Sequence, residues 1–376
     1  MEIREKNMYI NKRNILFISS TGETGGGPVQ ISLLINNLIN KMNFHLVCPK
    51  ENCFGSYLYK NSDVHFLYIK ERKLSLIDYI RILIYLKKNP VALIHSHGKG
   101  AGAIGRLVSL LSKKPHIYTF HGIHTLNYTL LYKYIYVFYE NLLGLIDREK
   151  IFVSDSEKAQ AIKNGIKVRN NYQVINNGVK EYIKTKEEDN FQKKIFKKFR
   201  INNKKKRIIS VCRLVKQKNI FEIIKIAKIC QDYTFIIIGD GPLYKQVINL
   251  INYEKIRNVT LTGRLDNVYP FLINSDIFLS TSLYEGLPIS VLEAMSVGLP
   301  ILASKVIGNI DTIEDGKSGF FYDLGDIYQA ANIIKNIMTD KKLKEKMGKA
   351  SKLRQRHFFS CSKMCAEHYS LYSKYF

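Results

Sequence analysis

Two cations and two carboxylates in the C-terminal half of the chain have the types and spacing to do chemistry together. Arg213 and Lys218 follow an apolar run, RIISVCRL, while Glu285 and Glu293 flank a Gly-Leu-Pro turn. An arginine and a lysine at a strand end suit a diphosphate, because arginine makes a forked contact and lysine acts as a point charge. Taken alone, the 210–219 segment fits an ordinary solvated loop better, so its meaning depends on the rest of the chain.

The Gly-Leu-Pro turn gives the two glutamates a distinct task. The sequence EGLPISVLEAMSVG predicts a loop that ends with Pro288 at the first helical position, and a helix that ends near Gly298. The free amides at this helix start would bind an anion. Because a carboxylate repels phosphate, each glutamate is better suited to accepting hydrogen bonds from hydroxyls on either side of the phosphates. The hydroxyls of a nucleotide sugar are such donors.

Short strands and helices must position these residues. The run NILFISS (14–20) predicts a strand, GETGGGPVQ (22–30) a glycine-rich loop and ISLLINNLINKM (31–42) an amphipathic helix, and further strands and helices alternate behind them. Such alternation predicts parallel strands with ligand sites at their carboxyl ends. Gly25–Gly27, His97 and His121 are therefore expected along one edge. IIIGDGP (236–242) adds a glycine pair, which on its own is a weak indication of a backbone that passes close to something.

A lysine-rich stretch, 184–207, separates two such sets of strands, and 376 residues exceed what one core normally fills. We predict an α/β protein with two Rossmann-like domains facing across a cleft. The expected bounds are 1–184, a linker at 185–206, and 207–357, with a last helix, 358–376, that packs back on the first domain.

These motifs together resemble the retaining glycosyltransferases of family 4, the glycosyltransferase group 1 with the GT-B fold. Over about 207–325 the resemblance is carried by Arg213 and Lys218, GDGP, TGR, EGLPISVLEAM and GLPILAS, in the family's order. Over 14–180 it is fainter and rests on the glycine-rich loop, TFHG, VSDSEKA and VINNGV. The resemblance implies a hexosyltransferase that uses a nucleotide-sugar donor, which we expect to be UDP-linked.

The resemblance also implies roles for single residues. Arg213 and Lys218 would bind the donor diphosphate and stabilise it as it leaves. Glu285 would accept hydrogen bonds from the donor sugar, Glu293 from the ribose, and His121 would contact the reacting sugar. The remaining donor contacts would come from Gly25, Gly26, Gly27, Gly239, Gly263, Arg264, Gly286, Leu287 and Pro288, with Gly263 and Arg264 near the base.

Breaking the donor bond places negative charge on the leaving diphosphate, and preorganised cations and amides lower the barrier to this step. Losing one of them is expected to slow the reaction about a hundredfold or more. The resemblance implies front-face attack with retention, in which the leaving phosphate takes the acceptor's proton. No metal or other cofactor is then required. One loop, VIGNIDTI, departs from the family pattern: Ile307 stands where members usually carry the first of two glycines, and Asp311 where they carry glutamate.

The net charge of +26 favours an anionic partner. No nucleic-acid-binding motif is present and the lysines are spread along the chain, so an anionic lipid surface or a lysine-rich background is the better interpretation. The first residues are charged and no run of 18 apolar residues occurs, which favours a cytoplasmic protein, or one peripheral on the cytoplasmic face of the inner membrane. The expected acceptor is a glycan or lipid-linked glycan in lipopolysaccharide or capsule synthesis.

Several other features have competing interpretations. His121 in TFHG is interpreted as a site residue, whereas His95 and His97 fit core or cleft equally well. The aromatic segment 127–146 is expected to pack in the core rather than dock on a membrane. His357, Cys361, Cys365 and His368 are too far apart on one helix, about 16 Å from end to end, to bind one metal ion, so they are interpreted as one helix face.

Two other functions remain open. A GT-B nucleotide-sugar epimerase would act on the donor without an acceptor, but would need additional acid and base carboxylates. A non-catalytic protein that binds anionic lipid or nucleic acid would not need intact Arg213, Lys218, Glu285 and Glu293.

Overall fold

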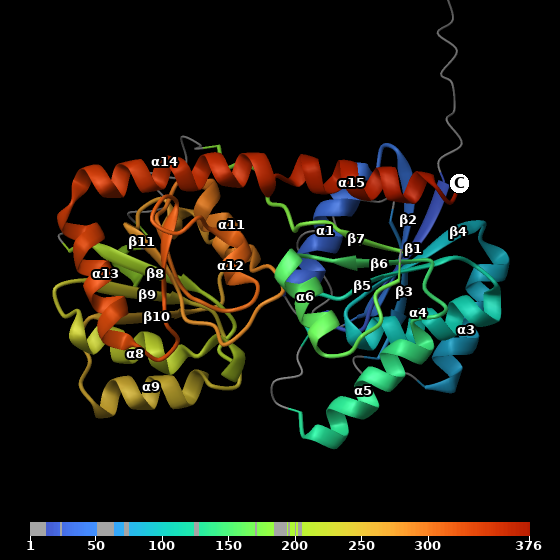
Figure 1. Ribbon diagram of the computed structural model, residues 1–376, viewed down its shortest axis with the longest axis horizontal. Coiled ribbons are helices and arrows are strands. Elements are labelled where there is room, and N and C mark those ends of the chain that lie inside the picture. Colours follow the sequence, from blue (N-terminus) through green and yellow to red (C-terminus); the bar gives the residue numbers. More distant parts are fainter. Residues whose placement is uncertain are drawn as a thin grey trace, which may run out of the picture.

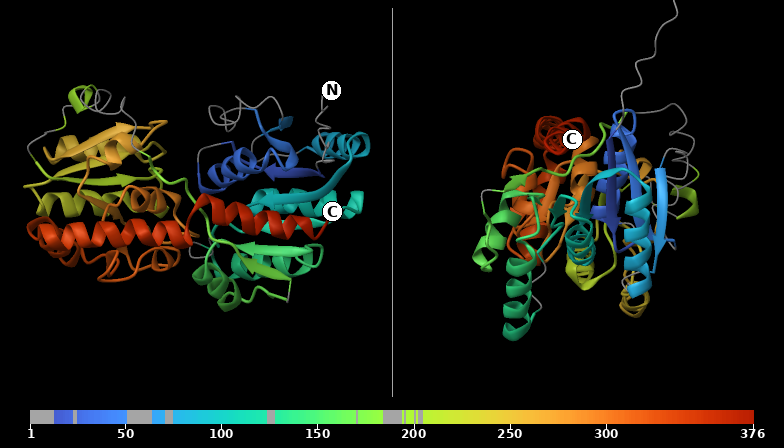
Figure 2. Two further views of the ribbon diagram at one scale, coloured as in Figure 1. Left: turned by 90° about the horizontal axis from the view of Figure 1, so that it is seen from above. Right: turned by 90° about the vertical axis from the view of Figure 1, so that its right-hand side faces the viewer.

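The computed structural model describes residues 13–22, 25–50, 64–70, 75–123, 128–169, 171–183, 194, 196–199, 201 and 205–376. Two sheets divide them, each wrapped by helices (Figures 1 and 2). The first unit contains strands β1 (Arg13–Ser19), β2 (Met42–Pro49), β3 (Val64–Ile69), β4 (Val91–His97), β5 (His116–Thr119), β6 (Glu149–Phe152) and β7 (Tyr172–Val174), and helices α1 (Gly26–Leu38), α3 (Leu76–Lys88), α4 (Lys99–Ser112), α5 (Leu130–Leu143) and α6 (Asp155–Lys163).

The second unit begins after the lysine-rich stretch. Its strands are β8 (Arg207–Val211), β9 (Thr234–Ile238), β10 (Val259–Gly263), β11 (Ile277–Ser280), β12 (Ile301–Ser304) and β13 (Gly319–Tyr322). Its helices are the 3₁₀ turn η1 (Lys216–Lys218), α8 (Ile220–Ile229), α9 (Tyr244–Tyr253), α10 (Tyr269–Leu272), α11 (Ile289–Ser296), α12 (Asn309–Thr312), α13 (Ile327–Thr339) and α14 (Lys341–Phe358). A final helix, α15 (Cys361–Ser373), follows.

Both sheets are parallel and follow the same winding. The first has the order β3-β2-β1-β4-β5-β6-β7 and the second β10-β9-β8-β11-β12-β13. Their strands are nearly continuous apolar runs, because helices cover both faces of a parallel sheet. In the first unit, α3 and α4 pack on one face, while α1 and α15 pack on the other. The predicted pair of Rossmann-like units is confirmed.

The strand order fixes where a ligand can bind. The strand order reverses between β1 and β4 in the first sheet and between β8 and β11 in the second. The connections that follow the two strands of each pair run to opposite sides, which opens a crevice at the carboxyl ends of these strands. In the second unit the crevice lies between the loop after β8, with Arg213 and Lys218, and the loop after β11, with Glu285. In the first unit it lies beside the start of α1.

The two C-terminal helices run along both units (Figure 1). Helix α14 packs against α11 and α13, the chain then turns at Phe359 and Ser360, and α15 packs against α1. The interpretation of His357, Cys361, Cys365 and His368 as one helix face is wrong, because the turn places His357 on α14 and the other three on α15. Most of the expected linker, 185–206, lies outside the described residues, although Phe196 and Ile201 pack in the core of the second unit.

The aromatic segment 127–146 does not pack as expected. It forms α5, in which only Tyr136 and Glu140 are buried. The opposite side of the helix, including Leu131, Tyr134 and Phe138, is exposed. The prediction of core packing is therefore wrong. Within the part of the chain that the structure describes, no helix is long and apolar enough to cross a bilayer.

Candidate functional site

Hydrogen bonds join the loops after β8 and β11 into one structure. The hydroxyl of Thr281 donates to the carbonyl of Lys218 at 2.9 Å, and the amide of Leu283 donates to the carbonyl of Gln217 at 2.8 Å. The side chain of Gln217 donates to the carbonyl of Tyr284 at 2.9 Å. One backbone hydrogen bond and two hydrogen bonds from side chains to backbone carbonyls therefore set the position of Lys218 relative to Glu285.

Lys218 and Glu285 form an ion pair at the centre of this structure. Ser282 donates to the Oε1 of Glu285 at 2.6 Å, and Gln217 reaches its Oε2 at 3.4 Å. Only 18% of the Lys218 side chain and 7% of the Glu285 side chain are exposed. A lysine that is partly buried at the sheet's crevice and already paired with a carboxylate can exchange that partner for a phosphate, because both are anionic oxygen acceptors.

Arg213 lies on the same side of the second unit. It is exposed, in a loop whose backbone pairs with the Gly239–Gly241 turn: Cys212 donates to Ile238, and Leu214 to Asp240 at 2.9 Å. Gly239 has a φ of +149°, and a Cβ there would lie 1.8 Å from the carbonyl oxygen of Cys212. The glycine pair that the sequence singled out therefore brings two backbones together, and so supports the arginine loop.

Gly263 and Arg264 lie at the end of β10, at the same carboxyl edge of the second sheet as Arg213. Gly239 donates to the carbonyl of Gly263 at 2.9 Å, so the loop after β10 lies beside the loop after β9. Gly263 has a φ of +76° and borders open space, and Arg264 is exposed. Both residues lie at the carboxyl end of β10, which is separated from β11 by two strands, so a ligand that spans Glu285 and Arg264 must be elongated.

The Gly-Leu-Pro turn lies against the first unit. A Cβ at Gly286 would come within 3.0 Å of the Gly122 nitrogen and of the Val153 side chain. Ser154 donates to the carbonyl of Gly286 at 2.8 Å, and Asn177 to that of Leu287 at 2.8 Å. This close approach favours glycine at position 286, because a side chain there would push the neighbouring atoms back. The turn that carries Glu285 is thus also the point where the two units meet.

Helix α11 begins just after the turn. Pro288 is its N-cap rather than its first helical residue, which differs from the prediction by one position. Glu293 lies on this helix and is partly buried, and burial raises the pKa of its carboxyl to about 7. No described residue makes a hydrogen bond with that carboxylate. Glu293 and Glu285 therefore differ, since only Glu285 has a cation beside it.

His121 faces the start of α1. A Cβ at Gly27 would lie 3.4 Å from the imidazole, while Gly25 and Gly26 border open space. His121 has a φ of +60°, uncommon for a side-chain-bearing residue, and shares a hydrogen bond of 3.0 Å with the buried His97. Burial, and then the charge that His368 would carry, lower the pKa of His121 to about 3. The neutral imidazole is thus the form next to the glycine-rich helix start.

The sequence left core and cleft equally open for His95 and His97, and the structure distinguishes the two. His97 is buried and its ring lies tilted against that of His95, with ring centroids 4.1 Å apart. His95 is bonded to Tyr372 of α15 at 2.8 Å and to Thr119 at 2.8 Å. His97 therefore supports the site, whereas His95 belongs to the core.

Contacts between the units involve residues that the sequence analysis did not select. Besides Ser154 and Asn177, the hydroxyl of Ser156 donates to the carboxylate of Asp311 and accepts from the amide of Gly308 at 2.9 Å. Asp311, one of the two residues that depart from the family pattern, is thus hydrogen-bonded to the first unit. Ile307 contributes its carbonyl, which accepts from the Glu285 amide at 2.9 Å, so this contact needs no particular side chain. Ser154 and Ser156 belong to the VSDSEKA motif and Asn177 to VINNGV, so the family resemblance marks these residues but not their partners.

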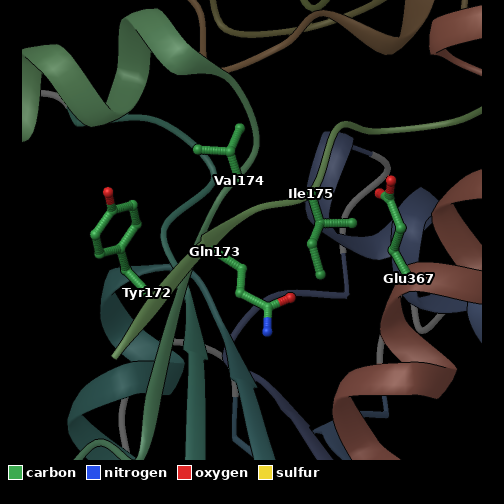
Figure 3. Close-up of a pocket in the computed structure, with 5 residues that line it drawn as sticks. All are labelled: Tyr172, Gln173, Val174, Ile175 and Glu367. Carbon is green, nitrogen blue, oxygen red and sulfur yellow. The ribbon is translucent and has the colours of Figure 1, made fainter. Parts of the chain in front are cut away.

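An open hollow of about 560 Å³ lies elsewhere, between β7 and α15 (Figure 3). Its lining residues are Tyr172, Gln173, Val174, Ile175 and Glu367. None of them is among the predicted donor-site residues. The crevice beside Lys218 and Glu285, with its ion pair and buried hydroxyls, is chemically the better candidate.

Both units match families of known proteins. Residues 24–181 match the family model described as Glycosyltransferase Family 4, and residues 191–354 match Glycosyl transferases group 1. The chain is 28% identical over 351 residues to a UDP-Gal:alpha-D-GlcNAc-diphosphoundecaprenol alpha-1,3-galactosyltransferase of Escherichia coli, covering 84% of this chain and 86% of that protein. It is 26% identical to the capsular polysaccharide biosynthesis glycosyltransferase CapM of Staphylococcus aureus, over 78% and 79% of the two chains.

Solved structures share the fold. Anabaena Alr3699/HepE in complex with UDP-glucose superposes with a TM-score of 0.84 at 18% identity, covering 96% of this chain and 99% of the other. A sucrose-phosphate synthase from Thermosynechococcus elongatus gives a TM-score of 0.81 at 16% identity, over 96% and 99%. The predicted GT-B fold is confirmed.

Proposed function

We propose that this chain, which belongs to the family 4, group 1 glycosyltransferases, transfers a sugar from a UDP-linked donor to a glycan acceptor with retention of configuration. The observation that carries the proposal is the Lys218–Glu285 ion pair, held by hydrogen bonds between the loops after β8 and β11 at the crevice of the second sheet, with the exposed Arg213 on the same loop as Lys218. Two cations and a hydroxyl-accepting carboxylate are the groups that a sugar diphosphate requires.

In the donor complex, the diphosphate would replace Glu285 as the partner of Lys218. Glu285 would then accept hydrogen bonds from hydroxyls of the transferred sugar, which are neutral and tolerate a carboxylate. As the glycosidic bond breaks, Lys218 and Arg213 stabilise the charge that grows on the leaving diphosphate. A leaving oxygen held on the acceptor's side of the sugar can take the acceptor's proton, which gives front-face attack. With two cations in place, this route needs no metal ion.

The relatives favour a bacterial surface polysaccharide as the product. The Escherichia coli relative is named for a diphosphoundecaprenol-linked acceptor and the Staphylococcus aureus relative for capsular polysaccharide synthesis. We therefore infer that the acceptor is a lipid-linked glycan.

The direct test supplies the purified chain with UDP-sugars in turn and follows thermal unfolding. A bound donor is expected to raise Tm by mass action, and UDP alone to do so less. With a donor that binds, NMR of the product on a GlcNAc-diphosphate-lipid analogue should show the donor's own anomeric configuration. An inverted product would overturn the retaining mechanism, and no response to any nucleotide sugar would overturn the function.

The alternative functions predict other results. An epimerase would convert the donor in the absence of acceptor, which the same NMR experiment detects. A purely lipid- or nucleic-acid-binding protein would show salt-dependent binding to vesicles or DNA without donor turnover.

Glu293 makes the donor affinity depend on pH. Its pKa of about 7 means that the carboxyl is protonated at pH 6 and ionised at pH 8. Because the carboxylate is the better acceptor for two ribose hydroxyls, the donor KM is expected to rise by up to about tenfold from pH 8 to pH 6. The Glu293→Gln variant, which does not titrate, should have a higher KM at pH 8 but a nearly constant one across this range. An equally steep dependence in the variant would exclude Glu293 as the titrating group.

A further inference from the structure

Most of the exposed large hydrophobic side chains in the described residues lie on three neighbouring helices of the first unit. They are Leu76, Ile77, Ile80 and Ile84 on α3, Leu107, Leu110 and Leu111 on α4, and Leu130, Leu131, Tyr132, Tyr134, Ile135, Phe138 and Leu142 on α5. We call these residues the α3–α5 face. A patch of this extent is more than a soluble monomer usually exposes, and typically marks an interaction or membrane site.

The three helices lie together on one side of the first sheet. Their buried residues, such as Ile82, Ile104 and Tyr136, face the sheet. Helix α3 contacts α4, and Arg106 of α4 is bonded to Glu140 of α5. Figures 1 and 2 show α5 projecting beyond the other helices of the unit. The exposed side chains therefore lie on three neighbouring helices in one layer of the first unit.

Helix α5 is held with its apolar side outward. Arg106 binds Glu140 at 2.9 Å in a fully buried ion pair, and Asn141 donates to the carbonyl of Gly165 at 3.0 Å. Lys99 lies 4.3 Å from the ring centroid of Tyr136. These polar contacts all hold the side of α5 that faces the unit. The helix cannot turn its leucines and aromatics inward without breaking a buried ion pair.

The charges around the α3–α5 face have one sign. Between residues 75 and 145 the acidic residues are Asp78 and Glu140, and both are buried. The basic residues in the same range, apart from the buried Arg106, are Arg81, Lys87, Lys88, Lys99, Lys113, Lys114 and Lys133. Apolar and aromatic side chains bordered by cations, without exposed acids, match the boundary of an anionic bilayer, where lysines meet lipid phosphates and rings enter the interface.

We propose that the α3–α5 face docks on an anionic lipid bilayer. This rests on the proposed function for its purpose, because α5 directly follows the His121 loop along the chain and would place that loop near a lipid-linked acceptor. The docking itself stands on the exposure, the anchoring of α5 and the charges. A second copy of the chain is the competing occupant. However, a contact between two α3–α5 faces would place the lysines around one face opposite those around the other.

The chain contains no tryptophan, so one introduced ring reports its own surroundings. In the Phe138→Trp variant, vesicles of phosphatidylglycerol and phosphatidylethanolamine should shift the emission to the blue, and brominated lipids should quench it. Tyr253→Trp, at an 87% exposed position on α9 of the second unit, is the control and should not change. Equal responses of the two reporters, or none at Phe138→Trp, would overturn the proposal.

Binding affinity gives the second measurement. Phe138→Glu should weaken binding to these vesicles at least about tenfold, because it places a carboxylate in the contact. Tyr328→Glu, at an equally exposed position (69%) on α13, should bind as the wild type does. Binding should fall with added salt and be much weaker on phosphatidylcholine. Equal affinity for neutral vesicles, or a wild-type dimer that Phe138→Glu dissociates, would overturn the proposal.

Turnover on a water-soluble acceptor analogue separates this inference from the proposed function. Phe138→Glu should leave that turnover unchanged. If vesicles fail to bind while turnover persists, only the docking proposal is wrong. If vesicles bind and no donor is turned over, only the proposed function is wrong.

Discussion

Replacing Lys218 with alanine is expected to lower kcat about a hundredfold or more, because the leaving diphosphate loses the cation that is already positioned for it. The structure shows why this position is demanding: Lys218 is paired with a buried carboxylate, and hydrogen bonds join the two loops that carry the pair. Arg213 would remain, so activity should fall without disappearing. The measurement is steady-state turnover of the UDP-sugar that raises Tm most.

Lys216 provides a matched control. It belongs to the same 3₁₀ turn, carries the same charge and is exposed. Lys216→Ala should therefore keep nearly full activity, which separates the positioned cation from the general positive field of the loop. If Lys218→Ala retained more than about a third of wild-type kcat with an unchanged Tm, the diphosphate would have to bind elsewhere.

The effect of replacing Glu285 depends on Lys218, with which it forms an ion pair. In Glu285→Gln, Lys218 loses its resting carboxylate, so UDP alone should bind at least as well as in the wild type. Transfer should still fall, because the amide is a weaker acceptor for the sugar hydroxyls. If Glu285→Gln slows transfer without weakening UDP binding, then Glu285 acts on the sugar rather than on the phosphates. Weaker UDP binding in this variant would contradict that assignment.

The sequence was sufficient for the fold and for grouping Lys218 with Glu285 in one candidate site, but their ion pair was not predicted. Alternating strands and helices predict parallel sheets, and strand order then brings loops that are 67 residues apart to one crevice. The seam between the units was not predictable in the same way. Ser154 and Asn177 contact backbone carbonyls across the units, and nothing in their local sequence indicates a partner so far along the chain.

The prediction that α5 packs in the core was wrong for a similar reason. Apolar residues at helical spacing predict one buried side, but periodicity does not say which side is buried. In α5 the buried side is set by Glu140, an acid whose partner lies on another helix. Arg106, Glu140 and Asp147 could each be read as surface charges, and only the fold shows that they meet.

Removing the charge of Arg106 should be the most destabilising single change that the structure predicts. The guanidinium is fully buried, lies 4.4 Å from the ring centroid of Tyr118, and binds Glu140 at 2.9 Å and Asp147 at 2.8 Å. Although burial alone would raise the pKa of Asp147, hydrogen bonds from His116 and Arg106 hold it below its usual value. Arg106→Met keeps most of the side-chain volume but leaves two buried carboxylates without the arginine. The free energy of unfolding, measured by urea denaturation, is expected to fall by about 3–5 kcal/mol.

The pH dependence and a compensated variant distinguish charge from packing. Without Arg106 the folded-state pKa values of the two carboxyls rise above their unfolded values. Such groups favour the folded state below the unfolded pKa, and that contribution is lost as pH rises through the folded pKa, so the Arg106→Met deficit should grow from pH 5 to pH 8. Adding Glu140→Gln and Asp147→Asn to Arg106→Met removes both unpaired charges and should recover a large part of the lost stability. A deficit that is the same at both pH values and in the triple variant would mean that Arg106 acts through its packing on Tyr118, and that the ion pairs are not what holds α5 in place.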